Sequence, residues 1–251
     1  METELQTLKK EIDELRNENI ALYNELVKQN KILFEQIISI GKELANQQNT
    51  VYQAIKNAEF ILDKVPGIRL IENKNEYLKY VFDKTDVSGG GGIYLEFGVY
   101  RGETVNLIAE AFPDKIIYGF DSFEGLPEDW RGTLFSKGTF NVNGKLPPVR
   151  ENVRLIKGWF NETLPEFVKA HPEPCAFIHV DCDLYSSTKT IFDNLKNQIV
   201  SGTVIAFDEY FGYPCWADGE YKAFMELIEE NNLEFEYIAR TNGMQVAVKI
   251  K

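Results

Sequence analysis

The chain has 251 residues, of which 44% are hydrophobic and 26% are charged, and its formal net charge is −12. This composition is typical of a globular protein with room for one large domain and an appendage. Residues 1–50 hold six Lys/Arg and nine Asp/Glu, which leaves −9 for residues 51–251. Because proteins that track phosphate backbones need a basic surface, we expect no nucleic-acid partner.

The sequence shows neither a membrane span nor a signal peptide. No stretch approaches 18 uninterrupted apolar residues, and the first twenty residues are charged throughout. The three cysteines, Cys175, Cys182 and Cys215, form no CxxC pair. We therefore expect a cytoplasmic protein with reduced thiols.

A seven-residue repeat runs through residues 1–50. Leucines at 8, 15 and 22 occupy one apolar position of the repeat, and the other holds Leu5, Ile12, Asn19, Leu26 and Leu33. Isoleucine at the first core position, leucine at the second and one buried Asn favour a parallel dimer. A single amphipathic helix packed on its own domain is the alternative, and we favour self-association through a coiled coil.

The next segment, residues 51–88, has a helical pattern broken at Pro66-Gly67 and is interpreted as a linker or cap. The glycine run at 88–92 precedes a strand and lacks the Lys-Ser/Thr ending of a phosphate loop, so we interpret it as a joint. Residues 89–251 then form the main domain.

Segments with strand and helix character alternate from residue 93 onward. Strands are expected over 93–97, 116–120, 153–156, 176–180 and 203–207, and helices over 103–112, 162–170, 187–199 and 219–231. Two further strands, 235–238 and 245–249, flank the turn Thr241-Asn242-Gly243, which is a hairpin signal. The pattern predicts an α/β fold with a mostly parallel seven-stranded sheet whose last strand is antiparallel. In such sheets ligands bind beyond the carboxyl ends of the strands.

Polar clusters follow the first two of these strands. The first is Glu96-Phe97-Gly98-Val99-Tyr100-Arg101-Gly102-Glu103-Thr104, and the second contains Asp121-Ser122. Glycines allow a tight turn into the helix. An acid at the position of Asp121 can accept hydrogen bonds from both hydroxyls of a ribose. A strand-helix turn without a ligand would use the same glycines, but together with Asp121 they indicate a nucleoside cofactor. The GxGxxG spacing of an NAD site is missing.

Acidic residues follow two later strands. Asp181 and Asp183 come after 176–180, and Asp208 and Glu209 come after 203–207. If these strands are neighbours, Asp181, Asp208 and Glu209 converge, and carboxylates crowd together in ionised form only around a cation. Oxygen ligands suit Mg²⁺ first, then Mn²⁺ or Ca²⁺. The alternative is that Asp183 and Ser186 cap the next helix and Asp208 merely ends a strand.

Five stretches in order, YLEFGVYRGETV, YGFDSFEGLPE, GWFNETLP, FIHVDCDLYSST and GTVIAFDEYFG, resemble the macrocin/mycinamicin O-methyltransferase family. These are class I, Rossmann-like sugar O-methyltransferases that use S-adenosylmethionine (SAM) and Mg²⁺. The resemblance covers about residues 90–250 and implies a SAM-dependent methyltransferase domain over 89–251. The heptad region lies outside it.

The resemblance also implies a role for each residue of the site. Asp181, Asp208 and Glu209 match the metal ligands, and Asp183 matches a general base. Many relatives have an Asp at the position of Glu209, whose extra methylene could change or remove its contact with the metal. The cofactor residues implied by the family are Glu96, Gly98, Gly102 and Thr104 around the methionine part of SAM, Asp121 at the ribose, and Ser122 and Trp159 beside the adenine.

The expected function is transfer of a methyl group from SAM to a hydroxyl of a sugar or nucleotide-linked sugar in a biosynthetic pathway. A bound Mg²⁺ would activate the hydroxyl, and Asp183 would take its proton. Two alternatives stay open. One is methylation of another small metabolite, phosphorylated or peptide-derived, and the other is a non-catalytic coiled-coil interaction protein with a SAM-binding fold.

Overall fold

The computed structural model describes residues 2–65, 67–85 and 91–251, which divide into two units, Met1–Ile55 and Lys56–Lys251. One long helix, α1 (Glu2–Lys64), fills the first unit and enters the second. The remaining helices are α2 (Lys74–Lys84), α3 (Glu103–Ala111), α4 (Phe160–Ala170), α5 (Tyr185–Leu195), α6 (Glu220–Glu230) and the short 3₁₀ helix η1 (Trp216–Asp218).

The second unit is built on one sheet with the order β1-β7-β8-β6-β5-β2-β3-β4. Among its strands only β8 runs antiparallel to its neighbours in the described chain, so the predicted α/β fold with an antiparallel last strand is confirmed. The seven predicted strands are present as β2 (Ile93–Phe97), β3 (Ile117–Asp121), β4 (Val153–Lys157), β5 (Cys175–Val180), β6 (Val204–Phe207), β7 (Phe235–Arg240) and β8 (Val246–Ile250). An eighth strand, β1 (Arg69–Leu70), pairs with β7 and was not predicted, because two residues are too few to show a period.

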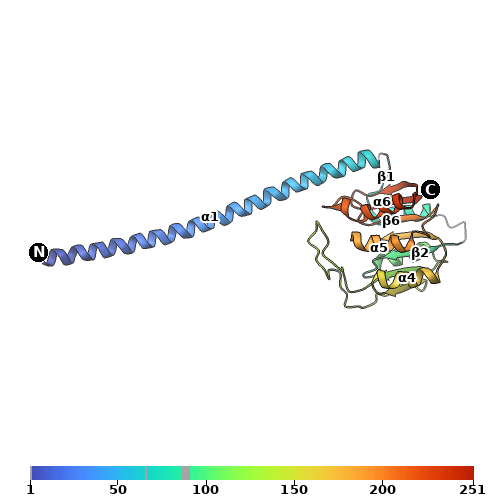
Figure 1. Ribbon diagram of the computed structural model, residues 1–251, viewed down its shortest axis with the longest axis horizontal. Coiled ribbons are helices and arrows are strands. Elements are labelled where there is room, and N and C mark those ends of the chain that lie inside the picture. Colours follow the sequence, from blue (N-terminus) through green and yellow to red (C-terminus); the bar gives the residue numbers. More distant parts are fainter. Residues whose placement is uncertain (1, 66, 86–90) are drawn as a thin grey trace. The chain divides into compact units, whose positions relative to one another are not determined.

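Helices cover both faces of the sheet, as alternation of strands and helices requires. Helices α4, α5 and α6 lie over one face (Figure 1), where Leu164, Ile191 and Phe224 join the larger apolar core. The opposite face packs against α2 and α3 through residues such as Val81 and Ile108. The sheet edge formed by the carboxyl ends of β2, β3, β5 and β6 is therefore left for a ligand.

Helix α1 carries the predicted heptad on a surface that is exposed in this chain. Ile12, Leu22 and Leu26 are 47%, 70% and 55% exposed. The side chains of Leu5 and Leu8 lie outside the described residues, as do Pro66 and residues 88–90 of the predicted joint. Within the described residues, no helix is both long enough and apolar enough to cross a membrane.

The end of α1 belongs to the second unit. Phe60 is 5% exposed, and its ring lies 5.1 Å from that of Trp216 and 5.4 Å from that of Phe211. Aromatic rings at such spacings stabilise a core beyond the area they bury. The last turns of α1 are thus anchored by aromatic packing, whereas the apolar side chains of its heptad part are exposed.

Candidate active site

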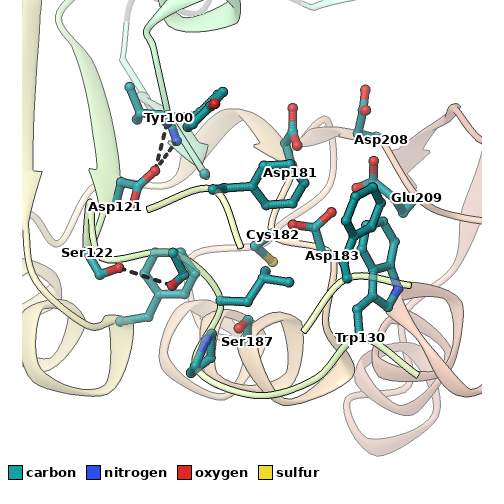
Figure 2. A pocket seen from close by; sticks show the side chains of 18 of the residues that line it. Tyr100, Asp121, Ser122, Trp130, Asp181, Cys182, Asp183, Ser187, Asp208 and Glu209 are labelled. Atoms are coloured by element: carbon teal, nitrogen blue, oxygen red, sulfur yellow. Dashed lines mark hydrogen bonds between the residues drawn. The ribbon is translucent and has the colours of Figure 1, made fainter. Parts of the chain in front are cut away.

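A cavity of about 640 Å³ opens at the carboxyl ends of the central strands. Asp121 and Ser122 lie on one side of it, and Asp183, Asp208 and Glu209 gather toward the other (Figure 2). The predicted residues that line it are Gly98, Thr104, Asp121, Ser122, Trp159, Asp181, Asp183, Asp208 and Glu209. The sheet thus brings together most of the residues selected from the sequence.

The turn after β2 depends on glycine at position 98. Gly98 has φ +94°, and a Cβ on it would lie 1.7 Å from the carbonyl oxygen of Asp181. No side chain fits such a space, so the β2 turn touches the end of β5 only because residue 98 is glycine. Gly102 has φ +84° and is the N-cap of α3, which places Thr104 in the first turn of that helix.

Asp121 fixes the loops after β2 and β3. Its Oδ2 accepts hydrogen bonds from the backbone N–H groups of Val99 at 2.9 Å and Tyr100 at 2.7 Å, and its Oδ1 accepts one from Phe123 at 2.6 Å. Bonds to an ionised carboxylate are among the stronger hydrogen bonds in proteins. Asp121 therefore orders this side of the cavity and keeps one face toward it.

Glu96 lies beneath the cavity and does not line it. Its Oε1 is 3.1 Å from Nδ1 of His179, its direct neighbour in the β2–β5 register, and both side chains are fully buried. Burial lowers the pKa of His179 to about 4 and raises that of Glu96 well above its usual range. Burial thus favours the uncharged form of each side chain.

The predicted convergence of the acids is present because β5 and β6 are parallel neighbours. The N–H of Asp208 donates to the carbonyl of Val180 at 2.9 Å, which brings the two strand ends together. A ring nitrogen of His179 and one carboxylate oxygen each of Asp181 and Asp208 lie within 4.8 Å of one another. Two carboxylates and an imidazole are ligands that a divalent cation accepts, so the donor set fits a metal ion.

Glu209 is 4% exposed and is not one of those three donors. Its backbone N–H donates to Oε2 of Glu220 at 3.2 Å, and its own Oε2 is buried without a hydrogen-bond partner. Burial, together with the charges of Asp208 and Asp181, raises its pKa well above the usual value. Glu209 as a metal ligand stays a prediction.

Asp183 has an unusual backbone and a shifted carboxyl group. Its φ is +66°, a left-handed conformation that costs energy for a residue other than glycine and that is concentrated at functional sites. Burial and the negative charges of Asp208 and Asp121 raise its pKa to about 7. The N-cap of α5 is Leu184, with no side-chain capping bond. The capping role considered for Asp183 is therefore not what the structure shows.

Lys74, at the start of α2, was not found from the sequence. Its ammonium lies 2.6 Å from Oδ1 of Asp208 and 4.0 Å from Oδ2 of Asp181. Burial opposes ionisation of Asp208, but Lys74 and His179 lower its pKa below the usual value. His179 was not selected from the sequence either; the signal that could have indicated it is its position two residues before Asp181, a spacing that places both side chains on the same face of the sheet.

The fold and this site define a class I methyltransferase. The structure is similar to that of CalS11, a calicheamicin methyltransferase, with a TM-score of 0.59 and 23% identity over 70% of this chain and 77% of that one. It is also similar to the O-methyltransferase NovP, with a TM-score of 0.54 and 23% identity over 70% and 78% of the two chains.

Residues 95–210 match the model of a methyltransferase domain family. With the relatives that follow, this match identifies the chain as a SAM-dependent O-methyltransferase, as the resemblance predicted. Demethyldecarbamoylnovobiocin O-methyltransferase of Streptomyces niveus is 27% identical over 190 residues, 65% of this chain and 69% of that protein. A tetracenomycin-C 4'-O-methyltransferase of Streptomyces olivaceus, named for a dimethoxy-rhamnosyl substrate, is 30% identical over 57% of this chain and 61% of its own length.

Proposed function

We propose that this enzyme methylates a hydroxyl of an uncharged sugar carried on a small molecule, with Asp183 as the general base and Mg²⁺ held at Asp181 and Asp208. The observation that carries the proposal is the placement of Asp183 beside these two acids on one wall of a cavity whose other wall has the cofactor residues of the family. In this arrangement SAM lies against Gly98, Asp121 and Ser122, and the acceptor lies toward the acids.

The roles of the chain's own residues follow from their positions. The loops after β2 and β3, whose backbone N–H groups donate hydrogen bonds to Asp121, orient SAM. The sulfonium of SAM makes its methyl group electrophilic. Asp183 accepts the proton that the acceptor hydroxyl loses as its oxygen takes the methyl group from sulfur. Asp181, Asp208 and His179 would hold the cation, which would lower the pKa of a coordinated hydroxyl. A base with a pKa near 7 is well matched to this task.

Charge in the cavity bears on the acceptor. Of the described residues that line it, six carry a carboxylate and only Lys74 and Arg101 carry a cationic group. A phosphorylated or nucleotide-linked acceptor would bring further negative charge against this acidic wall. A neutral glycoside fits better, and the S. olivaceus relative is named for methylation of a rhamnosyl compound.

An acceptor panel tests this proposal. Neutral rhamnosides and other deoxysugar glycosides, nucleotide-linked deoxysugars and sugar phosphates are incubated with methyl-labelled SAM, with Mg²⁺ or with EDTA. We expect label in a neutral glycoside, loss of turnover in EDTA and restoration by Mg²⁺. Faster methylation of nucleotide sugars than of the matched neutral glycosides would overturn the acceptor assignment, and full activity in EDTA would overturn the cation.

We also propose that α1 associates with a second copy of itself. The exposed apolar side chains of its heptad, such as Leu15, Leu22 and Leu26, support this, because an isolated helix gains little stability without a packed apolar face. Deletion of residues 1–45 should lower the assembly order in light scattering while SAM binding persists. Leu26→Asp should do the same, whereas Lys31→Asp, at an outer heptad position, should not. An unchanged mass after the deletion would contradict the coiled coil.

A further inference from the structure

Lys74 places a positive charge where the proposed cation would bind. Its ammonium is 2.6 Å from Asp208 and 4.0 Å from Asp181, and these acids supply two of the three donor atoms that lie within 4.8 Å of one another. A cation and an ammonium group cannot both occupy so small a space between the same two carboxylates. The two therefore exclude each other.

Without a metal, the repulsion between these acids has to be offset by another positive charge or by a proton. Asp208 is a buried residue, and an unpaired buried carboxylate is costly. The ion pair with Lys74 supplies the charge. Asn73 supports this geometry from the N-cap of α2, where its side chain accepts hydrogen bonds from the N–H groups of Asn75 and Glu76.

The lysine is nevertheless able to leave. The Lys74 side chain is 41% exposed, whereas that of Asp208 is 10% exposed. Lysine is a strongly hydrated point charge on a flexible stem, so its ammonium can withdraw into water by rotation about side-chain bonds while α2 stays in place. Lys74 also lines the cavity, so the withdrawal takes place at the entrance to the site.

We propose that Lys74 is the resident counter-ion of the cation site: in the metal-free enzyme it pairs with Asp208 and offsets part of the charge of Asp181, and a divalent cation binds by displacing it. This inference rests on the proposed cation site. It assigns to α2, outside the segment of residues 95–210 that matches the family model, a function in setting how tightly the metal is held. The apparent metal affinity is the intrinsic affinity multiplied by the fraction of molecules in which the ammonium has left the site.

Metal binding without substrate tests the proposal directly. Mn²⁺ affinity is measured by electron paramagnetic resonance for wild type, Lys74→Met, Lys74→Arg, Asp208→Asn and Lys79→Met. The last changes an exposed lysine of the same helix. We expect Lys74→Met to bind Mn²⁺ about tenfold or more tightly, Lys74→Arg and Lys79→Met to resemble or fall below wild type, and Asp208→Asn to lose binding.

The outcomes separate the two proposals. If wild type binds Mn²⁺ and Asp208→Asn does not, but Lys74→Met binds no more tightly than wild type, the cation site stands and the role of Lys74 is wrong. If Lys74→Arg gains as much as Lys74→Met, positive charge is not the competitor and the proposal is overturned. If no variant binds Mn²⁺, the cation site fails, and the role of Lys74 fails with it.

Displacement of the Lys74 ammonium can also be measured by its reactivity, which an effect of its charge on metal affinity alone would not change. Reductive methylation of lysines, followed by mass spectrometry, compares the labelling rate of Lys74 in Mg²⁺ with the rate in EDTA, with Lys79 as the internal reference. We expect Mg²⁺ to raise the labelling rate of Lys74 several-fold and to leave that of Lys79 unchanged. Equal rates for Lys74 in the two conditions would show that the ammonium stays in place, which would overturn the proposal.

Discussion

The two ends of the cavity differ in how their polar and charged groups are satisfied. At the glycine end, formed by Gly98, Tyr100, Asp121 and Ser122, a carboxylate accepts three backbone N–H groups and a glycine allows two loops to touch. At the acid end, formed by Asp181, Asp183, Asp208 and Glu209, burial raises the pKa of every carboxyl group except that of Asp208, which pairs with Lys74. At the glycine end the carboxylate is satisfied by hydrogen bonds within the fold, whereas the carboxyl groups of the acid end need a cation or a proton.

This contrast indicates where binding ends and chemistry begins. Groups that are satisfied in the free protein are pre-organised for a ligand and contribute mainly to affinity. Carboxyl groups left with raised pKa values are costly to the fold and are retained where they change protonation or bind charge. Substitutions at the acid end should therefore change turnover, and substitutions at the glycine end should change SAM affinity.

The largest effect is expected at Asp183. Asp183→Asn should lower kcat by about 10²–10⁴, the usual contribution of a general base, while the affinities for SAM and for Mn²⁺ stay within about twofold of wild type. Turnover with saturating Mg²⁺ and calorimetric SAM binding measure the two quantities. Asp193→Asn, at an exposed position on α5, is the control and should be fully active.

Two other results at Asp183 would contradict the division of work. A defect that excess Mg²⁺ repairs would make Asp183 a metal ligand like Asp181, for which Asp181→Asn is the reference. Full activity of Asp183→Asn would mean that another group takes the proton. Either result would show that Asp183 is not the general base.

A smaller effect is expected at the glycine end. Asp121→Ala removes an acceptor that three N–H groups share, and we expect SAM binding to weaken by about 1–3 kcal/mol. The same change should lower the melting temperature of the free protein, because the three bonds exist before SAM binds. Calorimetry and thermal unfolding measure the two effects. An unchanged SAM affinity would refute the placement of the cofactor at this end.

The sequence indicated the residues at both ends of the cavity, but not the partners with which two of the acids, Glu96 and Asp208, are paired. Asp181 and Asp208 could be predicted as neighbours because parallel strands end at one edge of a sheet. The partner of Glu96 could not be found from its motif: Glu96 lies inside β2 and pairs with His179 of β5, and its place in the cofactor site stays a prediction. Lys74 could not be found at all, since its approach to Asp208 depends on how α2 packs on the sheet, a tertiary property that no local pattern carries.

The smallest effect is expected where the acid end meets the long loop. Ser186, in the first turn of α5, donates a hydrogen bond to Glu128 at 2.5 Å and lines the cavity. This bond links the loop between β3 and β4 to α5 on the side where the acceptor is proposed to bind. Exposed hydrogen bonds contribute about 0.5–1.5 kcal/mol, so Ser186→Ala should raise the KM for the acceptor several-fold and leave kcat and SAM affinity unchanged.

Steady-state kinetics with each substrate varied in turn separates these effects. Ser201→Ala, at an exposed serine in the turn before β6, is the matched control and should behave as wild type. Because Ser186 lies three residues after Asp183, a fall in kcat would mean that the loop positions the base as well as the acceptor. A rise in the KM for SAM alone would contradict the comparison itself, because it would place the cofactor at the acid end, where only the acceptor is expected.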